Sequence, residues 1–69
     1  MQSMTISSVE AEVQRIADMA NDDESAHAAE DALHQSVLSY IVDHGDAKSA
    51  ALARAALATT NISFARWCA

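Results

Sequence analysis

The sequence predicts an all-α protein, and three observations support that prediction. The 69-residue chain contains one glycine and no proline, the two residues least compatible with a helix interior. Sixteen residues are alanine, which has the highest helix propensity because its side chain loses no rotamer freedom. Large apolar residues recur at spacings of three and four, as on one face of a helix. We expect a small bundle of three main helices, at about residues 8–20, 22–44 and 46–60, plus a short C-terminal turn or helix.

The first helix has a recognisable start. Ser7 is followed three residues later by Glu10, the spacing of a capping box, and Ile6 is placed to form a hydrophobic staple with Ala11. The helix is then expected to run from Ser8 to about Ala20. Its apolar stripe, with Met19 at one edge, comprises Val9, Val13, Ile16 and Ala20.

A polar segment, residues 21–25, predicts a turn before the second helix, with Asn21 as the N-cap and Glu24 three residues later. The alternative is one uninterrupted helix to His44. Gly45 then closes the helix in our prediction, because glycine tolerates a positive φ. The expected apolar face of the second helix consists of Ala26, Ala29, Leu33, Val37, Tyr40 and Ile41, widened by Leu38 and Val42.

Asp46 is the expected N-cap of the third helix. The helix should stop near residues 59–61, where Thr and Asn side chains compete for backbone hydrogen bonds. The remaining residues, 61–69, are expected to cover the bundle with Ile62, Phe64 and Trp67, although the two aromatics could instead anchor a partner. The inward residues of the third helix are predicted to be Leu52, Ala53, Ala56 and Leu57.

The chain is short enough that we expect a single domain over residues 1–69. Apart from alanine and Cys68, only 18 apolar side chains are available for a core. Their burial, at about 1.5 to 3 kcal/mol each, roughly balances an ordering cost of about 1.5 kcal/mol per residue. Stability is therefore expected to be marginal, and a second subunit would add to it.

Composition argues against several classes of protein. The net charge of −6 argues against direct binding to nucleic acid, which depends on Lys and Arg. A single cysteine, Cys68, forms no internal disulfide, which favours a reducing, cytoplasmic setting. The first nine residues do not resemble a signal peptide, and no apolar run is long enough to span a membrane.

Charge is unevenly distributed along the chain. Residues 1–31 contain eight acids against Arg15 alone. Our prediction is that this segment docks on a basic surface of a larger protein, where electrostatics gives speed and orientation. The alternative is a solvated acidic surface that serves solubility alone. The candidate partner-binding residues are Glu10, Glu12, Asp18, Asp22, Asp23, Glu24, Glu30 and Asp31.

One group of side chains has the spacing of metal ligands. His27, Asp31 and His34 lie within roughly 60° of one another on a helix. The alternative is a polar border beside the apolar face, with Glu30 and His34 in an ordinary i,i+4 contact. His44 lies in the last turn of the second helix, where the helix dipole is expected to favour its protonated form; we expect a capping and dipole role, and a pH switch is the alternative. No nucleophile motif or phosphate loop is present, so we predict no catalytic residue, no metal and no cofactor.

In its size, acidity and helical content the chain resembles phage-encoded inhibitors of host defence, such as anti-restriction and anti-CRISPR proteins. This resemblance implies that acids along a helix occupy a groove built for nucleic-acid phosphates. The leading prediction is thus a non-enzymatic interaction protein, and the resemblance implies that it acts as an inhibitor. A first alternative is a helical homodimer with an assembly role, paired through the stripes of the first two helices. A second alternative is a metal-dependent site at His27, Asp31 and His34.

Overall fold

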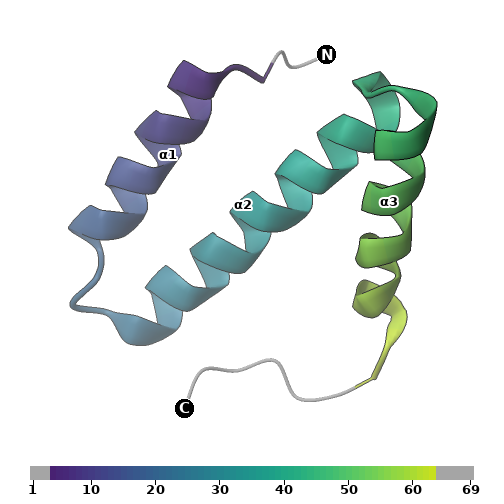
Figure 1. Ribbon diagram of the computed structural model, residues 1–69. Helices are drawn as coiled ribbons and strands as arrows, with labels where there is room; N and C mark the ends of the chain where they lie inside the picture. The colour runs from purple at the N-terminus through teal and green to yellow at the C-terminus, as the bar shows by residue number, and fades with distance from the viewer. Residues whose placement is uncertain (1–3, 64–69) are drawn as a thin grey trace. The chain divides into compact units, whose positions relative to one another are not determined.

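The computed structural model describes residues 4–63, and all regular structure in that range is helical (Figure 1). Helix α1 covers Ile6–Asp18, α2 covers Asp23–His44 and α3 covers Ala47–Leu57. A short 3-10 helix, η1, follows at Ala58–Asn61. The all-α prediction with three main helices is confirmed.

The chain groups into two compact units. Unit 1 contains α1 and the first part of α2, and its described residues are 4–33. Unit 2 contains the rest of α2 with α3 and η1, and its described residues are 34–63. The expectation of one domain over residues 1–69 stays a prediction.

The predicted N-cap of α1, Ser7, is wrong, and the helix begins at Ile6 instead of Ser8. Thr5 is the N-cap: its hydroxyl accepts from the Ser8 backbone N–H at 3.0 Å, and the Ser8 hydroxyl accepts from the Thr5 N–H at 2.9 Å. This reciprocal pair starts the helix earlier than a cap at Ser7 would, and so gains backbone hydrogen bonds. Ile6 therefore lies inside the helix, 81% exposed, and does not form the predicted staple with Ala11.

The predicted break between the first two helices is confirmed, but its cap is one residue later than expected. Helix α1 ends when Met19 and Ala20 donate to carbonyls three residues back, at 3.1 and 3.2 Å. Asp22, not Asn21, then caps α2: its carboxylate accepts from the Ser25 N–H at 3.2 Å and from the Ser25 hydroxyl at 2.9 Å. Asp22 is preferred because this one side chain satisfies both Ser25 donors.

Gly45 closes α2 for a different reason from the one predicted. It does not adopt a positive φ. Its N–H donates to the Ile41 carbonyl at 2.7 Å, and a Cβ at this position would lie 2.7 Å from that same oxygen. The turn therefore requires glycine for the close approach of backbone to backbone. Asp46 follows directly as the predicted N-cap of α3, accepting from the Ser49 N–H at 2.8 Å.

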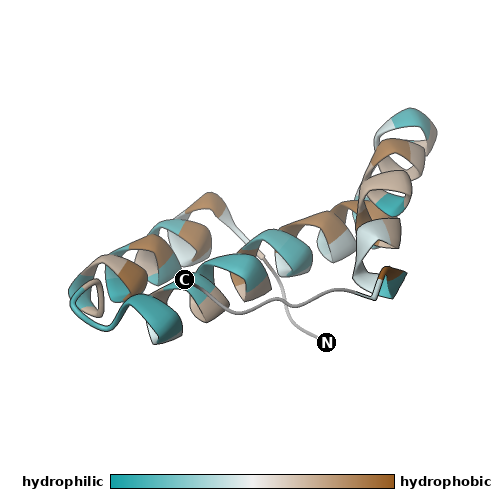
Figure 2. Cartoon of the chain, turned by 90° about the horizontal axis from the view of Figure 1, so that it is seen from below, coloured by the Kyte–Doolittle hydropathy of each residue, from teal (hydrophilic) through white to brown (hydrophobic). Residues whose placement is uncertain are grey.

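Few side chains are buried. Ala53 on α3, 4% exposed, is the one buried residue within the described range. The apolar face predicted for α2 is half-buried along its whole length. Figure 2 shows hydrophilic residues concentrated in the first half of α2. On α1 the half-buried residues are Val9, Glu12 and Ile16, and the C-cap residue Met19 continues this row.

Four residues predicted to be inward are exposed. Val13, 53% exposed, and Ala20 lie outside the half-buried stripe of α1. The stripe includes Glu12 instead. Its side chain is 32% exposed, and the salt bridge to Arg15 offsets the cost of partly covering the carboxylate. Leu52, 64% exposed, and Ala56 lie beside the half-buried face of α3, which follows the spacing Ser49, Ala50, Ala53 and Leu57.

Ile62, expected to help cover the bundle, is 55% exposed. Phe64, Trp67 and Cys68 lie outside the described residues, as does the predicted C-terminal segment beyond residue 63.

Candidate protein-docking surface

Four of the eight predicted docking residues lie together on the first part of α2. Asp23 and Glu30 are seven residues apart, as are Glu24 and Asp31. At about 100° per residue, each pair falls on the same side of the helix, and the four positions span an arc of about 120°. All four residues are exposed. We call Asp23, Glu24, Glu30 and Asp31 the α2 acidic face.

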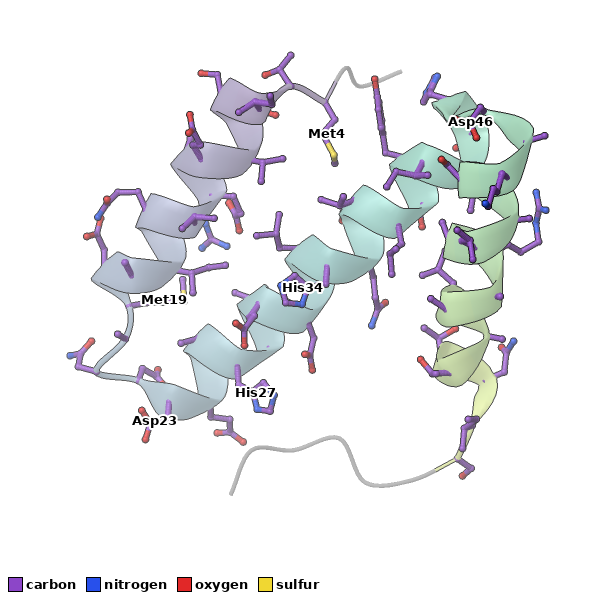
Figure 3. The ribbon with its side chains drawn as sticks, in the orientation of Figure 1. Met4, Met19, Asp23, His27, His34 and Asp46 are labelled. Carbon is purple, nitrogen blue, oxygen red and sulfur yellow. The ribbon has the colours of Figure 1, made fainter. Side chains whose placement is uncertain are left out.

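Two histidines share the side of α2 that carries the acidic face: His27 lies among its acids and His34 about one turn beyond them. Figure 3 labels Asp23, His27 and His34 along this part of the helix. The Nε2 atom of His27 is 3.8 Å from the Asp31 Oδ1 atom, an i,i+4 pair between partly exposed side chains. This distance is too long for a hydrogen bond, so the pair is an electrostatic contact only when the imidazole is protonated.

The other four predicted docking residues lie outside the α2 acidic face. Glu10 and Asp18 lie on α1, on the side away from its half-buried stripe, and the Gln14 side-chain amide donates to Asp18 at 3.0 Å. Asp22 is occupied as the N-cap of α2. The eight predicted residues therefore do not share one helix face. The four residues of the α2 acidic face are the ones that do.

Glu12 is the one predicted acid that is neutralised by an arginine within residues 4–63. The Arg15 guanidinium binds its carboxylate through both oxygens, with the Nε atom at 2.9 Å from Oε1. These hydrogen bonds, followed by the attraction of the guanidinium charge, lower the pKa of the Glu12 carboxyl and raise that of Arg15. Glu12 is thus less available to a partner than the four acids of the α2 acidic face.

The first acids of α2 also serve the helix itself. Asp23 and Glu24 occupy its first turn, where negative charge is favourable because the backbone N–H groups there carry partial positive charge. The spacing of Asp22 and Ser25 was the signal for the true cap, since an acid three residues before a serine can accept from both of its donors. A docking role for Asp22 therefore competes with its role in the fold.

The described part of the chain contains no group of three or more His, Cys, Asp or Glu side chains placed to hold a metal ion. His27 approaches Asp31, but His34 does not join them. The alternative contact, between Glu30 and His34, does not form an ion pair or hydrogen bond among residues 4–63; the i,i+4 pair is His27 with Asp31. Cys68 lies outside this range.

His44 is in the last turn of α2, as predicted. Its ring packs on that of Tyr40, with centroids 4.4 Å apart and planes inclined at 36°. The ring thus has a packing partner as well as a favourable position at the helix C-terminus. None of the helices in the described range is both long and apolar enough to cross a bilayer.

The chain was compared with models of protein families, with curated proteins and with solved structures, and none of the three comparisons gave a match.

Proposed function

We propose that this protein is a non-enzymatic interaction protein, and that the α2 acidic face docks on a basic surface of a larger protein in the cytoplasm. The partner surface is one that ordinarily binds nucleic-acid phosphates, so docking inhibits that binding. A regular helix that presents carboxylates along one side can meet the Lys and Arg side chains that line such a surface.

One observation carries the proposal. Asp23, Glu24, Glu30 and Asp31 are exposed on one helix face, and none of them is paired with a Lys or Arg side chain within residues 4–63. Paired acids would have to give up an internal partner before binding another protein. Acids without a Lys or Arg partner raise the negative potential around unit 1 and speed encounter with a basic surface.

The experiment is capture of partners from native cytosol on the immobilised full chain, at low and at high salt. Because exposed charges are screened at high ionic strength, the captured partner should be released as salt rises. Glu30→Lys and Asp31→Lys should each reduce capture at low salt. Asp22 is left unchanged, since altering the N-cap would weaken the helix as well as the surface.

Asp43→Lys is the matched control. Asp43 is also exposed on α2 and its replacement changes the net charge equally, but it lies outside the α2 acidic face. Capture should be retained in this variant. Equal loss with Asp43→Lys and Glu30→Lys would mean that total charge, not this face, governs binding. Capture that is indifferent to salt would contradict the proposal.

A homodimer with a structural or assembly role is the second candidate function. It is favoured by the scarcity of buried apolar side chains: within residues 4–63 no large side chain is fully buried. A chain of this size with so small an interior gains little stability from burial within one copy. Contact between two copies would bury additional apolar area and so add stability.

A further inference from the structure

The second half of α2 is apolar around most of its circumference. Between residues 37 and 42 only Ser39 is polar. At about 100° per residue the five apolar positions span an arc of about 200°. One neighbouring helix accounts for a stripe of about 100°. All five residues, Val37, Leu38, Tyr40, Ile41 and Val42, are half-buried and none is buried.

Helix α3, the other long helix of unit 2, supplies mainly small side chains to its covered face. The positions nearest to burial are Ser49, Ala50, Ala53 and Leu57, and the larger Leu52 is 64% exposed. Small side chains remove less apolar area from water than large ones. Unit 2 therefore retains incompletely covered apolar side chains on both of its long helices. We call this set the unit 2 apolar surface: Val37, Leu38, Tyr40, Ile41 and Val42 on α2, with Leu52 on α3.

Charge indicates what covers this surface. The described part of unit 1 has eight acids and one arginine, so two copies meeting there would bring together two charges of −7. The described part of unit 2 has two acids, Asp43 and Asp46, and two bases, Lys48 and Arg54. Contact through this neutral unit adds no net like-charge repulsion at the interface itself. A basic protein that docks on the acids has no electrostatic reason to choose unit 2.

We propose that a second copy of this chain covers the unit 2 apolar surface. The inference rests on the second candidate function, self-association, and specifies the interface. It replaces the pairing expected from the sequence, in which the stripe of the first helix also took part. The α2 acidic face is left free, so self-association and docking on a basic partner use different parts of the chain.

Sedimentation equilibrium of the full chain tests the proposal. The wild-type protein should form dimers in the micromolar range, and the dimer should persist at high salt, because an apolar interface does not depend on unscreened charge. Leu52→Glu should weaken dimerisation at least about tenfold, because an exposed side chain at the interface becomes charged and is not paired. Leu52→Ala, which preserves helix propensity, should weaken it to a smaller extent.

Val13→Glu is the matched control, because Val13 is 53% exposed but lies on α1 in unit 1. Dimerisation should be retained in this variant. Circular dichroism establishes that each variant remains helical, and Leu52→Ala provides the comparison if Leu52→Glu unfolds. A wild-type monomer at all concentrations would overturn the proposal. Equal weakening by Val13→Glu and by the Leu52 variant that remains helical would also overturn it. A basic partner captured by a monomeric wild-type chain would leave the acidic-face proposal standing alone.

Discussion

Units 1 and 2 are similar in length but differ in what their exposed side chains offer. Unit 1 presents the α2 acidic face, whose carboxylates have no Lys or Arg partner within residues 4–63. Its two helices begin with side-chain caps at Thr5 and Asp22. Unit 2 is electrically neutral in its described part and contains the one buried side chain, Ala53. The difference indicates that polar contacts at helix ends matter most in unit 1, whereas close packing matters most in unit 2. Substitutions that disturb close packing in unit 2 should therefore have larger effects than substitutions at the helix caps of either unit.

The largest effect is expected at Ala53. Replacing it by Gln inserts a larger amide into the only buried site of the described chain, with overpacking and an unsatisfied polar group as consequences. Ala53→Gln should lower the free energy of unfolding by about 2 to 4 kcal/mol. Ala55→Gln, an exposed position on the same helix, should change it by less than about 0.5 kcal/mol. Urea unfolding followed by circular dichroism measures both, and equal effects would mean that unit 2 is not held by packing.

Gly45→Ala tests the importance of close packing in unit 2, because packing decides whether this change raises or lowers the free energy of unfolding. At a position without strain this change stabilises a protein by about 0.4 to 1 kcal/mol, since the unfolded chain loses freedom. Here the new Cβ would lie 2.7 Å from the Ile41 carbonyl oxygen. We therefore expect destabilisation by at least about 1 kcal/mol. A stabilised variant in the same unfolding measurement would show that the turn has room for a side chain.

A smaller effect is expected at the start of α1. Thr5→Ala removes the hydroxyl that accepts from the Ser8 N–H and should cost about 1 kcal/mol, measured as a shift in the urea midpoint. Ser7→Ala should be nearly neutral, since Ser7 lies within the helix and Thr5 is the cap. A larger loss of stability with Ser7→Ala than with Thr5→Ala would indicate that Ser7 is the cap, as expected from the sequence.

The smallest effect concerns pH and Asp46. Hydrogen bonds from the Ser49 backbone N–H, then from its hydroxyl, lower the pKa of the Asp46 carboxyl. The contribution of Asp46 to stability is therefore complete above about pH 4 and is lost as the pH falls through the lowered value. Asp46→Asn, an equally good cap, should have nearly the wild-type Tm at neutral pH. Between pH 5 and pH 2 its Tm should fall by a few degrees less than that of the wild type. Parallel decreases would contradict the capping role.

The helices could be predicted from the sequence because composition and apolar spacing act over many residues at once. The break near Asp22 was also predictable, since several consecutive polar residues favour a turn. Asp46 was predicted correctly as the cap of α3, but the caps of the first two helices were not. Thr5 and Ser7, or Asn21 and Asp22, are both acceptable capping residues, and the choice depends on the hydrogen bonds that the serine three residues later can make. The role of Gly45 depends on one interatomic distance, which no spacing rule reveals.

The candidate surface was predicted only in part. Counting acids located the charge in unit 1, but could not show that Arg15 neutralises Glu12 or that Asp22 is used as a cap. These outcomes depend on side-chain geometry within a single turn. The seven-residue spacing that unites Asp23 with Glu30 and Glu24 with Asp31 was readable from the sequence, and it defines the surface that remains.

One capture experiment with two variants tests the central claim, that docking and self-association belong to different units. Glu30→Lys and Leu52→Glu are each immobilised and exposed to native cytosol at low salt. Glu30→Lys should lose the basic partner, whereas Leu52→Glu should still capture it. Loss of the partner by Leu52→Glu together with retention by Glu30→Lys would show that docking does not use the α2 acidic face.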